Sequence, residues 1–99
     1  MEIKKTQNGS ELTVALEGRL DTVTAPELEA ALGGLEGVTK LTIDMEKLAY
    51  VSSAGLRVLL NAQKKMAKNG GSMVVRNAND ELKEIFEITG FDEILTIEG

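Results

Sequence analysis

The chain has 99 residues, of which 42% are apolar, and a formal net charge of −5 at pH 7. This length and apolar content suit one compact fold, so we expect a single domain over residues 1–99. The acidic balance argues against a nucleic-acid surface, which needs a dense basic patch, and against binding to anionic lipid.

Two residue types that carry much of protein chemistry are missing. The sequence has no cysteine, which excludes disulfides and thiolate metal sites, and no histidine, which excludes a Ser-His triad and most zinc sites. No apolar stretch reaches the ~18–20 residues of a membrane span. Residues 1–10 carry no hydrophobic signal core. We therefore expect a soluble, cytoplasmic protein with no metal, no cofactor and no membrane partner.

The chain opens with the pattern of a β-hairpin. Residues 2–7 predict a short strand, and an Asn-Gly pair at positions 8 and 9 is favoured in tight hairpins. Leucine and valine then alternate with threonine and alanine over residues 12–16, which is typical of a half-buried strand. The two segments predict a pair of antiparallel strands.

A helix and another strand follow. Thr24 and Glu27 have the spacing of a capping box, and Pro26 lies in the first turn, where its missing N–H costs little. Gly33 and Gly34 are placed to end this helix. The sequence KLTIDM, residues 40–45, predicts a short apolar strand.

Residues 53–68 give the strongest helix pattern, and Gly70 supplies its stop. The spacing predicts a buried face made of Leu56, Leu59, Leu60, Gln63, Met66 and Ala67. The opposite face carries Arg57, Asn61, Lys64, Lys65 and Lys68. This stripe is either a solvated face whose lysines complement the helix dipole or a surface that meets an acidic partner.

The last third contains a strand, a helix and a final strand. The strands are predicted at residues 72–76 and 93–97, and the helix lies between Asn79, which can cap it, and Gly90, which ends it. The order is therefore β-β-α-β-α-β-α-β. Strands joined through helices pair in parallel by right-handed crossovers. We expect an α/β fold with a four- to five-stranded mixed sheet and three main helices.

Ser52 and Ser53 stand where the long helix begins, and physical chemistry alone leaves two roles open for them. A serine there is either an N-cap worth about 1 kcal/mol or a phosphoacceptor whose phosphate lies over the unpaired N–H groups. An enzymatic role is disfavoured. A nucleophilic serine would have no histidine as its base, and neither a G-x-S-x-G elbow nor a phosphate-binding loop is present.

Three segments in order carry a resemblance to a known family: ALEGRLDTVTAPELEAAL, LTIDMEKLAYVSSAGLRVLL and NGGSMVVRNANDELKEIFEITGFDEIL. They resemble a STAS domain of the bacterial anti-sigma factor antagonist family, over about residues 10–97. The resemblance implies a protein without catalysis of its own. It implies a partner switch that binds an anti-sigma factor with serine kinase activity, and so releases a sigma factor, until phosphorylation of one serine blocks binding. A serine phosphatase would restore it.

Aligned on Gly55-Leu56, the family's Asp-Ser-Ser-Gly-Leu motif places the acceptor at Ser53. Ser52 then stands in place of the aspartate and is the rival acceptor, and Ala54 replaces the second serine. Asp21, in GRLD, matches an aspartate that lies on the same rim in the family. The resemblance thus implies a partner-binding surface made of Asp21, Ser52, Ser53, Ala54, Gly55 and Arg57.

Two further expectations concern assembly. The acidic surface and short chain predict a monomer or a weak dimer. The alternative function is a STAS scaffold or subunit of a signalling or lipid-transport assembly, in which the serine is only a helix cap.

Overall fold

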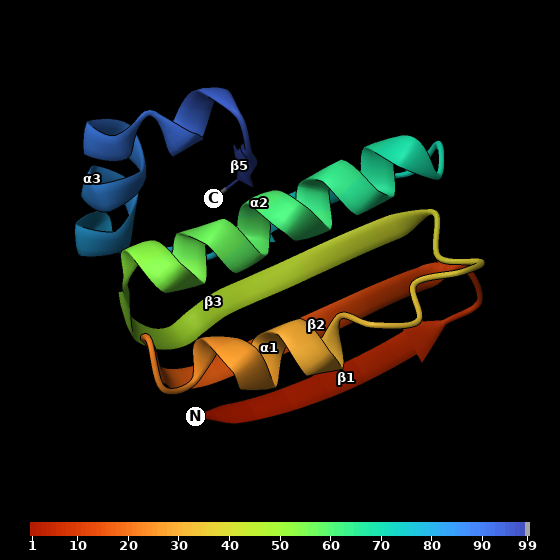
Figure 1. The fold of residues 1–99 in the computed structure, drawn as a ribbon, viewed down its shortest axis with the longest axis horizontal. Coiled ribbons are helices and arrows are strands. Elements are labelled where there is room, and N and C mark those ends of the chain that lie inside the picture. Colours follow the sequence, from red (N-terminus) through yellow and green to blue (C-terminus); the bar gives the residue numbers. More distant parts are fainter. Residues whose placement is uncertain (99) are drawn as a thin grey trace.

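The computed structural model describes residues 1–98 (Figure 1). The strands are β1 (Glu2–Asn8), β2 (Glu11–Leu20), β3 (Lys40–Val51), β4 (Ser72–Arg76) and β5 (Thr96–Glu98). The α-helices are α1 (Ala25–Ala31), α2 (Ser53–Lys68) and α3 (Asp80–Thr89), and a 3-10 turn, η1, spans Phe91–Glu93. The predicted order of strands and main helices is confirmed.

The five strands form one sheet in the order β1-β2-β3-β4-β5. β1 is antiparallel to β2, and each later strand is parallel to the one before it. The hairpin turn consists of Gly9 and Ser10, since Asn8 pairs with Glu11. Gly9 has a φ of 63°, a left-handed conformation that favours glycine. The predicted mixed sheet is confirmed, with five strands.

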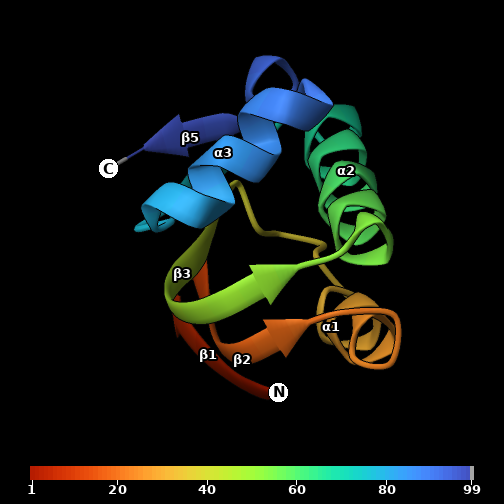
Figure 2. The same ribbon diagram turned by 90° about the vertical axis from the view of Figure 1, so that its left-hand side faces the viewer.

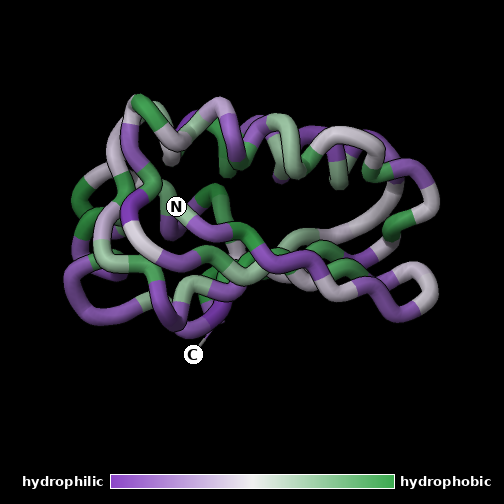
Figure 3. Tube along the Cα trace, turned by 90° about the horizontal axis from the view of Figure 1, so that it is seen from below, coloured by the Kyte–Doolittle hydropathy of each residue, from purple (hydrophilic) through white to green (hydrophobic). Residues whose placement is uncertain are grey.

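The core lies on one face of this sheet. Every second residue along parts of β2, β3 and β4 is buried against the helices. These residues are Leu12, Val14, Leu16, Leu41, Ile43, Met73 and Val75. Leu82 and Phe86 of α3 belong to the same buried cluster. Figure 2 shows α1 and α2 packed side by side next to the sheet, and Figure 3 shows hydrophilic and hydrophobic residues alternating along the chain. The other face carries exposed or half-buried residues.

β3 is twice as long as the predicted strand at residues 40–45. It has two register shifts against β2, between Ala15 and Glu17 and between Gly18 and Arg19, and each adds one residue to β3. Leu48 and Val51 are therefore buried three positions apart rather than two. Bulges of this kind break the alternation that marks a strand in a sequence.

The buried face of α2 differs in part from the prediction. Leu56, Leu59 and Met66 are buried as expected, whereas Leu60 and Gln63 are half-buried and Ala67 is exposed. Val58 and Ala62 are buried instead. They line the same groove as Leu32 at the end of α1, so the packing of α1 against α2 turns the buried face towards that side.

The C-terminal region follows the prediction with one shift. Asn79 caps α3, because its side-chain oxygen accepts a 2.8 Å hydrogen bond from the N–H of Leu82. Gly90 ends the helix with a φ of 78°. The turn at residues 91–93 displaces the last strand, which begins at Thr96 rather than at residue 93. In the part of the chain described, no helix combines the length and apolar character that crossing a membrane requires.

Candidate functional site: the serine rim

The C-terminal ends of β2 and β3 bring two loops together. The parallel strands pair Arg19 with Tyr50 and Leu20 with Val51. Beyond the last pair, the N–H of Ser52 donates a 2.8 Å hydrogen bond to the carbonyl oxygen of Leu20. We use the term serine rim for residues 19–24 together with residues 50–57. The structure therefore brings the loop that contains Asp21 next to the start of α2.

Ser52 is the N-cap of α2. Its backbone is extended, with φ −94° and ψ 173°, and its hydroxyl oxygen accepts a 3.3 Å hydrogen bond from the N–H of Gly55. Its carbonyl oxygen accepts the first helical hydrogen bond, 2.9 Å, from the N–H of Leu56. Ser52 is half-buried. The capping role that the sequence left open between two serines thus belongs to Ser52.

Ser53 has a different environment, although it is the next residue. It is the first residue of α2 and is exposed. Among residues 1–98, its hydroxyl group has no hydrogen-bond partner. The N–H groups of a helix's first turn and the positive end of its dipole lie beside this position. A group added to the Ser53 oxygen would therefore meet solvent and helix N–H groups rather than core.

Asp21 organises its own loop. One carboxylate oxygen, Oδ1, accepts 3.0 Å hydrogen bonds from the N–H groups of Val23 and Thr24, while Oδ2 lies 4.0 Å from Nε of Arg19. The hydrogen bond from the Thr24 N–H is the main cause that lowers the pKa of Asp21 below its usual value of 3.8. The Thr24 hydroxyl, the Val23 N–H and the Arg19 charge act in the same direction, against partial desolvation. Asp21 is ionised at neutral pH.

The capping box predicted for Thr24 and Glu27 is wrong. Thr24 is the N-cap of α1, but its backbone is helical, with φ −92° and ψ −17°, and its side chain makes no capping hydrogen bond. The Thr24 hydroxyl instead donates a 2.7 Å hydrogen bond to the carbonyl oxygen of Arg19 and accepts one of 2.8 Å from the N–H of Asp21. Thr24 therefore closes the loop on which Asp21 lies.

The remaining predicted rim residues divide into two groups. Arg57 is exposed, one turn beyond Ser53 on α2, and Ala54 is half-buried beside it. Gly55 is buried, and a Cβ built on it would lie 2.6 Å from Cγ of Leu20 and 3.0 Å from Cγ2 of Val51. The prediction that Gly55 contacts a partner needs correcting, because this residue lets α2 approach β2 and faces the core.

Three rim residues were not predicted from the sequence. The guanidinium carbon of Arg19 lies 4.4 Å from the ring centroid of Tyr50, a cation–π contact across the strand pair. Tyr50 is 36% exposed and Val23, at the tip of the Asp21 loop, is 81% exposed. Exposed apolar groups beside a polar rim are a common feature of protein-binding surfaces. An apolar residue in a loop next to GRLD was the only signal for Val23.

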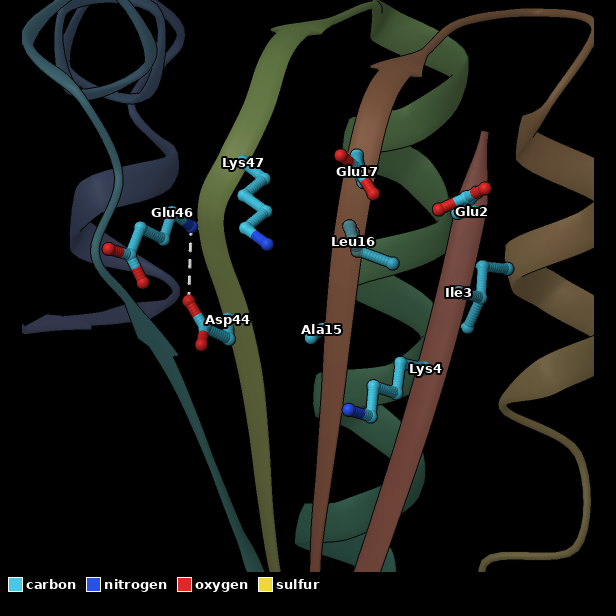
Figure 4. A pocket seen from close by; sticks show the side chains of 9 residues that line it. All are labelled: Glu2, Ile3, Lys4, Ala15, Leu16, Glu17, Asp44, Glu46 and Lys47. Carbon is cyan, nitrogen blue, oxygen red and sulfur yellow. Dashed lines mark hydrogen bonds between the residues drawn. The ribbon is translucent and has the colours of Figure 1, made fainter.

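A separate hollow of about 540 Å³ lies on the opposite, uncovered face of the sheet (Figure 4). Its lining residues are Glu2, Ile3, Lys4, Ala15, Leu16, Glu17, Asp44, Glu46 and Lys47. Asp44 accepts hydrogen bonds from the N–H of Glu46, at 3.0 Å, and from Nδ2 of Asn77, at 3.1 Å. These hydrogen bonds tie the Asp44 carboxylate to the bulge of β3 and to Asn77. Within the described residues, no group of acidic side chains could hold a metal ion.

Comparisons with known proteins show which family the chain belongs to. The model of the family described as "Mlab, STAS domain" matches residues 3–96. The anti-sigma-B factor antagonist of Bacillus subtilis is 34% identical over 92 residues, which cover 92% of this chain and 84% of that protein. An anti-sigma factor antagonist from Mycobacterium paratuberculosis has a similar crystal structure, with a TM-score of 0.84 and 26% identity over 97% of this chain and 83% of that one.

A third comparison concerns fold alone. The structure of the Bacillus cell fate determinant SpoIIAA in its phosphorylated form has a TM-score of 0.77 and 16% identity, and it covers 99% of this chain and 92% of that chain. The names of these relatives describe regulatory proteins and not enzymes. The resemblance stated from the sequence is confirmed: the chain is a STAS domain protein and belongs to the anti-sigma factor antagonist family.

Proposed function

We propose that this protein is a phosphorylation-controlled partner switch. When Ser53 is unmodified, the serine rim binds an anti-sigma factor that is also a serine kinase, and a sigma factor is released. When Ser53 carries a phosphate, the rim no longer binds, and a serine phosphatase reverses the block. The proposal places the protein in the cytoplasm, where sigma factors act. Its support is the kinship with anti-sigma-B factor antagonists and the chemistry of one residue.

The observation that carries the proposal is the contrast between the two serines. The Ser53 hydroxyl is exposed at the first residue of α2, whereas the Ser52 hydroxyl is half-buried and accepts a hydrogen bond from Gly55. A kinase can reach the first without disturbing the helix. Phosphorylation of Ser52 would modify the half-buried hydroxyl that accepts the hydrogen bond from the N–H of Gly55. Ser53 is therefore the proposed acceptor, and Ser52 the rival.

The blocking step is electrostatic. Unmodified, the rim presents two exposed arginines, Arg19 and Arg57, beside a neutral serine and the apolar side chain of Val23. A phosphate adds about −1.5 to −2 charge. Desolvating this charge at an interface is costly unless the partner supplies cations. Asp21, which is ionised and on the same rim, adds negative charge, although its carboxylate is turned towards its own loop.

The block needs no refolding of the domain. The phosphate would lie over the helix N–H groups, which form a natural anion site. The solved SpoIIAA structure, named for its phosphorylated form, has the same fold as this chain. We expect phosphorylation to change the charge of the rim and leave the sheet and helices in place.

The test combines site mapping with binding. The protein, Ser53→Ala and Ser52→Ala are each incubated with ATP and an anti-sigma factor kinase from the same organism, and phosphate is localised by mass spectrometry. We expect one phosphate on the protein and on Ser52→Ala, and none on Ser53→Ala. Calorimetry should show that Ser53→Ala binds the kinase like the unmodified protein, while the phosphoprotein does not. Phosphate on Ser52, or undiminished binding by the Ser53 phosphoprotein, would refute the proposal.

A second candidate function has one observation in its favour. Ser52 replaces the aspartate that precedes the acceptor serine in many relatives, so the carboxylate that would accompany kinase recognition is missing. A STAS scaffold or subunit that is never phosphorylated is the corresponding alternative. It predicts no phosphate on either serine in the same experiment, together with membership of a stable assembly.

A further inference from the structure

The exposed side of α3 is acidic and ends in an apolar residue. Asp80, Glu84 and Glu87 follow i, i+4, i+7 spacing and so share one helical face. Ile88, next to Glu87, is 76% exposed. These four residues, with Lys83, line one shallow hollow. We use the term acidic α3 face for Asp80, Glu84, Glu87 and Ile88.

A groove of opposite charge lies between α1 and α2 and has a volume of about 300 Å³. Leu32, Val58 and Ala62 are buried residues along it and make its surface apolar. Asn61, Lys64 and Lys65 line it from α2, and Glu29 lines it from α1. The two lysines outweigh the single carboxylate, so the α1–α2 groove is net positive. No acidic residue occurs anywhere in Ser53–Lys68.

We propose that the acidic α3 face of one molecule docks into the α1–α2 groove of a second copy of this chain. The apolar Ile88 side chain would lie on the apolar surface of the groove, where its burial is favourable. Glu84 and Glu87 would meet Lys64 and Lys65. The charges match across the contact, while within residues 1–98 none of these four side chains forms an ion pair.

The arrangement of the two surfaces explains why a second copy is the occupant. Each molecule carries both halves of the contact, and they lie on different sides of the fold, with α1 and α2 side by side and α3 away from their groove (Figure 2). One molecule can therefore donate its α3 face and accept another at the same time. A contact of this head-to-tail kind builds a ring if the rotation between copies closes and an open chain if it does not.

The strength of the contact is limited by overall charge. Each copy carries −5, which opposes approach. At 0.1 M ionic strength, this repulsion is screened beyond about 10 Å, whereas pairs in contact are screened less. We expect weak, concentration-dependent association. The association does not involve Ser53, so its test is independent of the proposed phosphorylation switch.

The test is analytical ultracentrifugation of the full chain across roughly 0.01 to 1 mM, the range of weak association. The weight-average mass should rise continuously with concentration. The pair Lys64→Glu/Lys65→Glu should abolish the rise, because it makes the groove acidic, and Glu84→Lys/Glu87→Lys should abolish it because it makes the α3 face basic. An equimolar mixture of the two variants should associate again, since each acidic groove then meets a basic α3 face.

A matched control separates local from overall charge. Lys4→Glu/Lys5→Glu on β1 changes the net charge by the same amount as the groove variant, from −5 to −9, yet leaves both surfaces intact. It should still associate, with the rise in mass shifted to higher concentration. Circular dichroism checks that each variant is folded. A wild-type mass that stays monomeric throughout, variants that associate alone like the wild type, or a mixture that stays monomeric would overturn the proposal.

Discussion

The N–H of Ser52 donates a 2.8 Å hydrogen bond to the carbonyl oxygen of Leu20, and this bond continues the β2–β3 pairing by one residue beyond Val51. Ser52 is therefore fixed on both sides, by β2 through its backbone and by α2 through its hydroxyl group. The position of Ser53 follows from this, since the next residue must enter the helix beside β2. The following predictions test the contacts that hold the rim.

The two serines should contribute differently to stability. Ser52→Ala removes the hydroxyl that caps α2, so we expect a loss of about 1 kcal/mol in the free energy of unfolding. Ser53→Ala should change the free energy of unfolding by no more than about 0.5 kcal/mol, because Ser53 is exposed and the substitution removes no contact. Urea denaturation of both variants measures the difference. Equal losses would show that the cap is shared between the serines.

Gly55→Ala should destabilise the protein although alanine is the better helix former. The added Cβ would lie 2.6 Å from Cγ and 2.9 Å from Cδ2 of Leu20, which is fully buried. Overpacking of this kind costs about 1–3 kcal/mol, and the gain from helix propensity is at most about 1 kcal/mol, so the loss should dominate at so short a contact. Urea denaturation of Gly55→Ala, Leu20→Ala and the double variant checks the cause. The double variant should lose less than the sum, whereas strict additivity would exclude a clash with Leu20.

The Asp21 loop should make the free energy of unfolding depend on pH under acidic conditions. The pKa of Asp21 is lowered in the folded protein, chiefly by the hydrogen bond from the Thr24 N–H. Its contribution to stability is therefore present above the unfolded value of 3.8 and is lost as the pH falls through the lower folded pKa. In chemical denaturation from pH 2 to 7, Asp21→Asn should be less stable than the wild type at neutral pH. The difference should shrink towards the acidic end.

A second acidic substitution controls for general charge effects. Glu27 is an exposed carboxylate on α1, in the same region as Asp21. The Glu27→Gln variant removes one negative charge from the same region and is measured in the same series as the matched control. A stability difference for Asp21→Asn that is the same at pH 2 and pH 7 would contradict a role for the Asp21 charge.

Asp44 should stabilise the bulge in β3. Its Oδ1 atom accepts hydrogen bonds from the N–H of Glu46 and from Nδ2 of Asn77. A typical hydrogen bond contributes about 0.5–1.5 kcal/mol net, so Asp44→Ala should cost at least that much. Glu46→Ala removes a neighbouring exposed carboxylate without removing its own N–H, and it should be close to neutral. Thermal unfolding compares the two, and equal effects would exclude a specific role for Asp44.

Asn77 allows the same contact to be tested from the other side. It has a φ of 61°, a left-handed conformation that few residues other than glycine adopt readily. Asn77→Gly should lose only the bond to Asp44, whereas Asn77→Ala should lose the bond and add backbone strain. Unfolding measurements should therefore rank Asn77→Ala as the less stable variant. The reverse order would show that conformational strain is unimportant at this position.

Much of the fold could be predicted because its elements are local. The hairpin turn, the start of α2 at two serines and the αL stop at Gly90 each depend on a few consecutive residues, although the turn consists of Gly9 and Ser10 rather than of the Asn-Gly pair. The second half of β3 could not be predicted, because its two bulges arise from pairing with β2. They place the buried residues Leu48 and Val51 three positions apart, not the two that mark a strand. For the same reason, the length of β3 and the position of Tyr50 escaped the sequence pattern.

The geometry of the candidate site also depends in part on contacts between residues distant in sequence. The serine pair and Asp21 stand in recognisable motifs, but the choice between Ser52 and Ser53 as cap depends on which residue has an extended backbone. The Arg19–Tyr50 contact joins residues that are distant in sequence and depends on strand register. The burial of Gly55 depends on where Leu20 lies, and so could not be read from the motif that contains it.

The strand order also has a consequence for how the chain is made. Every strand after β1 pairs with the strand immediately before it in the sequence. Each strand after β1 therefore finds a partner strand already synthesised when it leaves the ribosome. Contacts between neighbouring segments favour rapid folding. We expect the sheet to grow in one direction during translation, from the N-terminal hairpin to β5, with the rim complete once α2 has emerged.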